Sequence, residues 1–274
     1  MEKIREPIVE GIFYPSDKHK LNKLVDSLVQ AADVSREDAW GVIAPHAGFR
    51  YSGAIAAAAF KAARRRTART VVILAPLYRT EKDEVLFSES ARFRMPAGNI
   101  KVDRRAVEEL LGFSTRFQAD DIPHLEEHGI EVQLPFVARL FPQASIVPVL
   151  LGRVRRGTIR ALTRALEHVF GDRRRDVVYV ISANLTSFMQ GEAARNEAQI
   201  ILDAVVARDP ESLLSALETG KITSCGVPSM AVLLSLLGRS CTAEILSSGN
   251  SSAINKDFRE LVHYAAVALY GEEA

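Results

Sequence analysis

The chain has 274 residues, of which 47% are hydrophobic and 25% are charged, a composition typical of a globular α/β protein. Its 35 basic and 34 acidic residues leave a formal net charge of +1, so no overall field would attract nucleic acid or an anionic membrane. No apolar run is long enough to span a bilayer, and the opening segment MEKIREPIVEG lacks the apolar core of a signal peptide. Because Cys225 and Cys241 are too few for a disulfide framework, we expect a cytoplasmic protein with reduced thiols.

Hydrophobic periodicity, caps and turn residues divide the chain into alternating helices and strands. The elements predicted in the first half are a helix after Ser16 or Asp17, a strand at Gly41–Ala44, a helix at Ala54–Arg65 capped by Ser52, a strand at Thr70–Ala75, a hairpin of Glu84–Ser88 with Ala91–Met95, a turn at Pro96–Asn99 and a helix from Asp103 to Leu111. Those of the second half are a helix at Glu131–Leu140, a strand at Ser145–Leu151, a helix at Thr158–Phe170, a strand at Val177–Ser182, helices at Glu192–Ala207, Glu211–Leu217 and Met230–Leu237, and closing strands at Ala243–Ser247 and Leu261–Tyr270 joined by the link Ser248–Asn255.

This alternation predicts one αβα sandwich with a mostly parallel central sheet, spanning residues 1–274 as a single domain. The continuous β-branched run Thr70–Ala75 is typical of a parallel strand covered on both faces. Pro148 predicts an irregularity or an edge position for its strand, because proline cannot donate a hydrogen bond to a neighbour. The two closing strands are expected to be antiparallel or to lie at the edge.

The stretch Gly41–Gly53, with the sequence GVIAPHAGFRYSG, has a composition typical of a binding site. His46, Arg50 and Tyr51 follow a predicted strand, and ligands of α/β proteins bind where strands end. A simpler interpretation is that His46 only hydrogen-bonds to the backbone of a tight turn.

The acidic segment Asp120–Phe136 carries two further histidines, His124 and His128. Their spacing of four would place both on one helix face, but Pro123 and Gly129 argue against a regular helix before Gly129. We therefore expect His124, with Asp121, to lie in a loop at the rim of a binding cleft. We favour a structural role for His128, as a hydrogen-bonding centre with Glu127 and Glu131.

Several segments together resemble the Memo family, which includes the bacterial AmmeMemoRadiSam system protein B group and is related in fold to the class III extradiol ring-cleavage dioxygenases. The matching segments, spread over nearly the whole chain, are Arg5–Pro15 (REPIVEGIFYP), Ala44–Gly53 (APHAGFRYSG), Met95–Val102, Asp121–Phe136 with EHGIEVQLPF at its centre, Ser224–Gly226 and Val262–Tyr270. The resemblance implies a class III extradiol dioxygenase-like fold with a metal-capable cleft at the carboxyl edge of the sheet.

The family pattern also implies a set of site residues, which this chain retains only in part. His46 matches the histidine of the family's PHAG motif, and Cys225 matches a late cysteine. The second family histidine, in a GPSH segment, is replaced by Tyr78. An SSDxSH segment supplies an Asp and a His in the family, and these positions are Asn184 and Ser187 here.

These replacements weaken both the metal-binding and the acid–base chemistry that the resemblance implies. Non-haem iron oxygenases need two histidines and a carboxylate, whereas a thiolate suits copper, zinc or iron–sulfur chemistry better. His46 and Cys225 remain as metal ligands, with Tyr78 as a third if its phenol loses its proton, and Ser187 cannot replace a histidine as a base near neutral pH. Without the family pattern, Cys225 would be read as a buried structural thiol.

We therefore expect a Memo-family protein with a degraded metal site, which uses the ancestral cleft to bind a small molecule or a protein partner without catalysis. The expected cleft residues are His46, Arg50, Tyr51, Tyr78, His124, His128, Asn184, Ser187 and Cys225. The alternative is a metal-dependent oxidoreductase of the extradiol dioxygenase type with an altered ligand set, in which iron, copper or zinc would bind weakly. A third hypothesis, a scaffolding role, would let the loops at the rim tolerate substitution freely.

Overall fold

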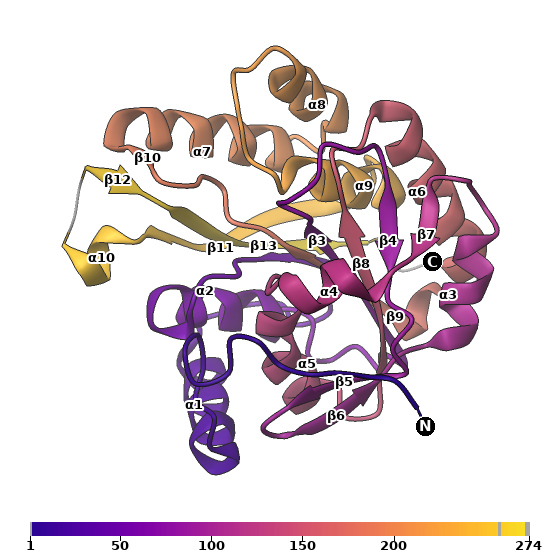
Figure 1. The fold of residues 1–274 in the computed structure, drawn as a ribbon. Helices are drawn as coiled ribbons and strands as arrows, with labels where there is room; N and C mark the ends of the chain where they lie inside the picture. Colours follow the sequence, from indigo (N-terminus) through magenta and orange to yellow (C-terminus); the bar gives the residue numbers. More distant parts are fainter. Residues whose placement is uncertain (1, 257–258, 272–274) are drawn as a thin grey trace.

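A computed structural model describes residues 2–256 and 259–271, and within these residues an eight-stranded mixed sheet forms the centre of the molecule (Figure 1). The strands follow one another across the sheet in the order β11 (Thr242–Asn250), β13 (His263–Tyr270), β2 (Gly41–Ala44), β9 (Val177–Ser182), β3 (Thr70–Pro76), β8 (Ser145–Leu151), β4 (Val85–Phe87) and β7 (Phe117–Ala119).

The middle of this sheet is parallel, as the sequence predicts. Strands β2, β9, β3 and β8 pair in parallel, and every residue of β2, β3 and β9 is buried. Strands β13 and β11 close one side in antiparallel pairing, and β4 runs antiparallel to β8 on the other side. The predicted antiparallel closing strands are therefore confirmed.

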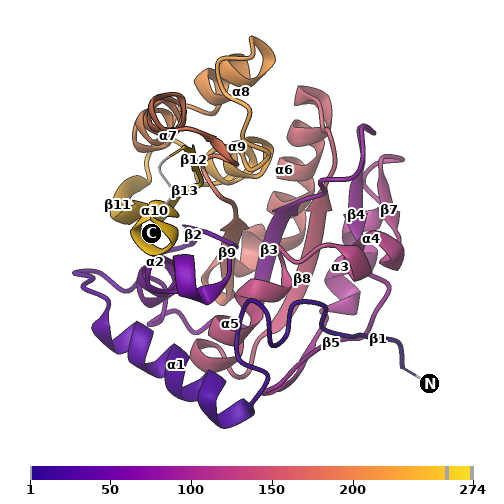
Figure 2. The same cartoon turned by 60° about the vertical axis from the view of Figure 1, so that its left-hand side comes forward.

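Helices cover both faces of the sheet and complete the three layers (Figure 1; Figure 2). One face carries α1 (Lys18–Ala31), α2 (Phe49–Lys61) and α5 (Leu134–Leu140), and the other carries α6 (Arg156–Phe170), α7 (Gly191–Val206), α8 (Pro210–Glu218) and α9 (Val227–Leu237). The remaining helical segments are short. They are α3 (Arg104–Leu111), α4 (Asp121–Glu126), α10 (Ser252–Asn255) and the 3-10 turns Glu131–Gln133 and Gly171–Asp176. The apolar side chains between the layers form one continuous core.

The predicted hairpin between Glu84–Ser88 and Ala91–Met95 is wrong. Strand β4 belongs to the main sheet, whereas β5 (Arg92–Met95) forms a hairpin with β6 (Gly98–Lys101) and pairs with β1 (Ile4–Arg5). Gly98 and Asn99, predicted as part of the turn, are the first residues of β6. The short strands carry too little local pattern to identify partners that are distant in sequence.

Three other features differ from the sequence prediction. Helix α2 begins at Phe49 after Gly48, so Ser52 does not cap it and instead donates a hydrogen bond to the Ala47 carbonyl. Pro148 lies in an interior strand with regular β3 pairing, and β4 pairs with β8 only from Val149 onward. The link predicted at 248–255 is structured, because β11 extends to Asn250 and α10 follows; β12 (Glu260–Leu261) then pairs with β10 (Met189–Gln190).

A buried ion pair between Arg5 and Glu131 holds the N-terminal segment against the core. The Glu131 carboxylate also accepts hydrogen bonds from the backbone N–H groups of Ile8 and Val9, at 2.9 and 3.0 Å, and from the Tyr14 hydroxyl at 2.6 Å. Glu131, rather than the predicted His128, is therefore the hydrogen-bonding centre of this region.

We expect Glu131→Gln to lower the free energy of unfolding by about 3–5 kcal/mol, because the substitution leaves the buried Arg5 cation without its counter-charge. Equilibrium urea denaturation measures this change. The matched control is Asp26→Asn, which removes the exposed ion pair with Arg139 and should change the free energy by about 1 kcal/mol or less. Equal effects of the two substitutions would contradict the structural role of Glu131.

Candidate binding cleft

A cavity of about 860 Å³ opens at the carboxyl edge of the parallel strands. Strands β2, β9 and β3 are neighbours that end at Ala44, Ser182 and Pro76, so the residues that follow them meet at one edge of the sheet. Ile12 and Phe13 of the N-terminal segment form one wall, and Asn255 of α10 belongs to another. Helix α10 lies beside α2 (Figure 2). We call this cavity the cleft.

Most of the residues predicted for the site line the cleft. Those present in its wall are His46, Arg50, Tyr51, Tyr78, His128, Asn184 and Ser187. The two predicted residues outside this wall are Cys225, whose thiol nevertheless lies near Tyr78, and His124.

His46 lies at the floor of the cleft, fully buried and hydrogen-bonded through both ring nitrogens. Its Nδ1 lies 3.0 Å from the Ser182 hydroxyl, and its Nε2 lies 2.8 Å from the Tyr78 hydroxyl. Its backbone N–H donates to Oδ1 of Asn184 at 3.1 Å. Burial, reinforced by the nearby His128, lowers the pKa of His46 to about 3, so the ring is neutral at physiological pH.

The partners of Ser182 determine which nitrogen of His46 carries the proton. The Ser182 hydroxyl donates to the Gly129 carbonyl at 2.6 Å and accepts from the Gln133 side-chain amide at 2.9 Å. Because this single hydroxyl hydrogen is already used, His46 must donate to Ser182 from Nδ1. The Nε2 lone pair then faces the cleft and accepts the hydrogen of Tyr78.

Tyr78 lies close to both residues that match the family's ligands. Its hydroxyl hydrogen-bonds to Nε2 of His46 at 2.8 Å, and the Cys225 thiol is near enough to affect the pKa of the phenol. Partial burial and the nearby Cys225 raise the pKa of Tyr78 far above its ordinary value, and burial raises the pKa of Cys225 as well. Both groups are therefore protonated at neutral pH.

His128 and Phe13 complete the aromatic wall above this floor. The His128 ring is parallel to that of Tyr78, within 6°, and lies edge-on to His46 with the ring centres 5.4 Å apart. Phe13 contacts His128 edge-on at 5.1 Å. Burial lowers the pKa of His128 below its ordinary value. The wall is therefore built from neutral rings.

The structure does not place His124 or Asp121 at the rim of the cleft. His124 lies within α4, not in a loop, and its fully buried ring approaches the Leu86 carbonyl at 3.3 Å and Phe93 edge-on. Asp121 is also buried and accepts hydrogen bonds from Ser88 and Ser90. Asp120 caps α4, and this local cap outweighs the helix-breaking tendency of Pro123 in the helix's first turn.

Two further residues hold the floor in position. Sequence reasoning missed Gln133 and assigned Glu127 to a hydrogen-bonding centre at His128. Glu127 accepts a hydrogen bond from the Tyr78 backbone N–H at 2.8 Å, so it fixes the loop that follows β3. Gln133 bridges Ser182 and the Pro45 carbonyl. Both lie in the segment EHGIEVQ, and its match to the family pattern is the one feature of the sequence that points to a role for them.

A close backbone approach positions the Cys225 loop. A Cβ atom added to Gly226 would lie 2.4 Å from the Ala183 Cβ, so only glycine fits beside the end of β9. Ser224 donates a hydrogen bond to the Asn184 carbonyl at 3.0 Å. Helix α9 begins at Val227, three residues earlier than predicted, and this brings Cys225 directly before its first turn.

The side chains of the cleft do not fit a resident catalytic metal. In the described part of the chain, no cluster of three or more His, Cys, Asp or Glu side chains has the geometry to hold a metal ion. His46 Nε2, the nitrogen that would bind a metal, already accepts the hydrogen of Tyr78, and both Tyr78 and Cys225 would have to lose protons whose pKa values are raised.

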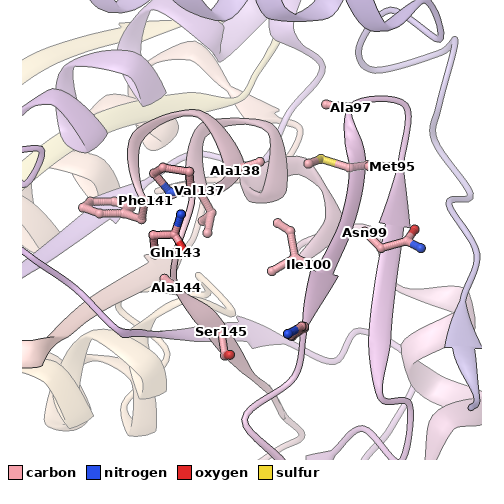
Figure 3. Close-up of a pocket in the computed structure, with 13 residues that line it drawn as sticks. Met95, Ala97, Asn99, Ile100, Val137, Ala138, Phe141, Gln143, Ala144 and Ser145 are labelled. Atoms are coloured by element: carbon pink, nitrogen blue, oxygen red, sulfur yellow. The ribbon is translucent and has the colours of Figure 1, made fainter.

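A second, smaller cavity of about 300 Å³ lies near the opposite edge of the sheet (Figure 3). It lies between the β5–β6 hairpin, the end of α5 and the start of β8 at Ser145. Its lining includes Met95, Ile100 and Phe141 but no histidine, cysteine or carboxylate. Its chemistry therefore provides no second candidate for a catalytic site.

The fold and the cleft define an α/β protein with a large open site at the carboxyl edge of its sheet. Residues 5–268 match the family model described as Memo-like protein. The chain is also similar to MEMO1 family proteins of Thermotoga neapolitana, at 32% identity over 97% of this chain and 99% of that protein, and of Thermoplasma volcanium, at 28% identity over 96% and 97%. The chain therefore belongs to the Memo family. Among its described helices, none combines the length and apolar character needed to cross a membrane.

We expect the neutral, buried His46 to make the protein less stable in acid. The pKa of His46 is about 3 in the folded protein, against about 6.5 in the unfolded chain, so only the unfolded chain takes up this proton between the two values. Above about pH 6.5 the buried His46 therefore costs no stability. Below that pH, it lowers the free energy of unfolding by up to about 1.4 kcal/mol for each pH unit.

Urea denaturation of the wild type and of His46→Asn, at several pH values between about 7.5 and 4.5, tests this expectation. The amide of asparagine can still donate to Ser182 but does not titrate. In the variant, the slope of the unfolding free energy against pH should fall by the amount that corresponds to about one proton. Part of the slope should persist, because the pKa of the buried His124 is also lowered, to about 4. An unchanged pH dependence in His46→Asn would contradict the neutral state of His46.

Proposed function

We propose that this Memo-family protein binds a small organic molecule, or a segment of a partner protein, in the cleft without a resident metal and without catalysis. The observation that carries the proposal is the Tyr78 hydroxyl, which hydrogen-bonds to Nε2 of His46 and lies near the Cys225 thiol. It therefore occupies the lone pair with which the one retained histidine would bind a metal. The size of the cleft, about 860 Å³, lies within the range of small-molecule sites.

A kinship in fold with the class III extradiol dioxygenases is part of this proposal. The parallel centre of the sheet and the position of the cleft support it. Ring cleavage by such enzymes requires two histidines and a carboxylate around iron, whereas the three positions that match the family's ligands hold one histidine, His46, with the phenol of Tyr78 and the thiol of Cys225. We therefore expect no cleavage of catechols. We also propose a cytoplasmic location, because the two unpaired thiols suit a reducing compartment.

The second candidate is a metal-dependent oxidoreductase with an altered ligand set. One observation favours it: His46, Tyr78 and Cys225 meet at one point although they come from three separate loops. Such a site would require both the phenol and the thiol to ionise when a metal binds, against the raised pKa of each.

Metal titration of the purified protein separates the two candidates. Iron(II), copper(I) and zinc(II) are titrated anaerobically into the wild type, Tyr78→His, Tyr78→Phe, His46→Ala and Cys225→Ala, after elemental analysis of each protein. We expect the wild type and Tyr78→Phe to bind weakly. Tyr78→His should bind at least about tenfold more tightly, because it adds a nitrogen ligand beside His46 and Cys225.

Stoichiometric metal in the wild type, lost in both His46→Ala and Cys225→Ala, would refute the proposal and favour the oxidoreductase. Turnover of a catechol by the iron-loaded wild type that disappears in His46→Ala would do the same. Tyr78→Phe is the matched control, since it removes the hydroxyl but adds no ligand.

A further inference from the structure

The mouth of the cleft is lined by unusually exposed apolar side chains. Ile12, from the N-terminal segment, is 77% exposed, and Phe188, from the loop after β9, is 75% exposed. These are the two most exposed large apolar side chains among the described residues. Phe188 also has a positive φ of 48°, a conformation that a bulky residue rarely adopts. Exposed apolar groups at the entrance of a cavity favour a ligand with an apolar body.

The interior of the cleft has no charged side chain that could pair with an ionic ligand. His46, His128 and Tyr78 line the interior, and none of these rings carries a permanent charge. The charged side chains of the wall are Arg50 and Glu260, which have opposite signs and are both exposed at the rim. Burying an ion against neutral rings would cost its hydration without a paired charge, so the interior favours an uncharged ligand.

The direction of the hydrogen bonds determines what the floor can offer to such a ligand. Ser182 fixes the proton of His46 on Nδ1, and Tyr78 therefore donates inward to Nε2. The Tyr78 hydroxyl therefore has no hydrogen left to donate to a ligand. Because Tyr78 is 44% exposed and lines the cleft, a lone pair of its oxygen can accept a hydrogen bond from a ligand.

We infer that the ligand of the cleft is an uncharged aromatic molecule that donates a hydrogen bond to the Tyr78 hydroxyl oxygen. Its ring would lie between the aromatic floor and the apolar mouth, and its N–H or O–H group would point to Tyr78. This inference rests on the proposed function, because it specifies the chemistry of what the cleft binds. Tyr78 would then act as the specificity-determining residue. Its oxygen would accept a hydrogen bond from a ligand that has a donor, and would stay without that hydrogen bond when the ligand has none.

Indole and N-methylindole are a suitable pair of probes, because they differ mainly in the presence of one donor. Isothermal titration of the wild type should give saturable binding of indole and binding of N-methylindole about threefold to tenfold weaker, the ratio that one hydrogen bond supports. In Tyr78→Phe, which keeps the ring and removes the acceptor, the ratio should fall to about one. Tyr270→Phe is the matched control outside the cleft, and it should retain the wild-type ratio.

Circular dichroism and thermal unfolding establish that each variant is folded before its ratio is interpreted. A change in the NMR chemical shifts of the His46 ring when indole is added would place the probe in the cleft. Equal binding of both probes by the wild type would overturn the inference but leave the cleft as a binding site. A ratio that persists in Tyr78→Phe would also overturn it. Binding of neither probe would contradict the inference, whereas the metal titration decides the proposed function separately.

Discussion

The hydrogen bond from the Ser182 hydroxyl to the Gly129 carbonyl, 2.6 Å long, sets the direction of the hydrogen bonds that the His46 ring makes at the floor of the cleft. Because Ser182 has one hydrogen, His46 donates to it from Nδ1, and Tyr78 in turn donates to Nε2. The result is a hydrogen-bonded chain of neutral groups that runs from the Tyr78 phenol to the backbone at Gly129. Burial lowers the pKa of the imidazole and raises those of the phenol and the thiol, so each group favours the same uncharged state.

This chain depends on the folding of segments that are distant in sequence. Ser182 ends β9, His46 follows β2 and Tyr78 follows β3, and the parallel pairing of these strands brings the three together. The N-terminal segment, held by Glu131, then places Phe13 against His128 and encloses the floor from one side. The cleft is thus a product of the sheet topology and of one buried carboxylate, which links the stability of the fold to the shape of the site.

The interior of the sheet could be predicted from the sequence because its strands carry a continuous apolar pattern. Thr70–Ala75 and Val177–Ser182 are buried on both faces and have that pattern at every position. The pairing of β4 and β5 could not be predicted, since strands of three or four residues find partners through tertiary contacts. The start of α2 was missed because Gly48 provides no side-chain cap to mark it.

The site was predicted unevenly for similar reasons. His46, Tyr78 and Cys225 could be placed together because each belongs to a motif of the family pattern, whereas the spacing of His124 and His128 suggested a shared face that the chain does not form. A cap at Asp120 makes a short helix that carries His124 into the core, and the chain then leaves the helix before His128. The direction of the hydrogen bonds could not be read from sequence at all, because it depends on the three partners of one serine hydroxyl.

The protonation state of the His46 ring tests the central claim most directly. Long-range proton–nitrogen NMR spectra of the uniformly labelled protein, recorded at neutral pH, distinguish the two neutral tautomers and the charged ring. A neutral ring with its proton on Nδ1, and an Nε2 signal that shifts in Tyr78→Phe, is the predicted result. A proton on Nε2, a charged ring, or an Nε2 signal that does not respond to Tyr78→Phe would contradict the account.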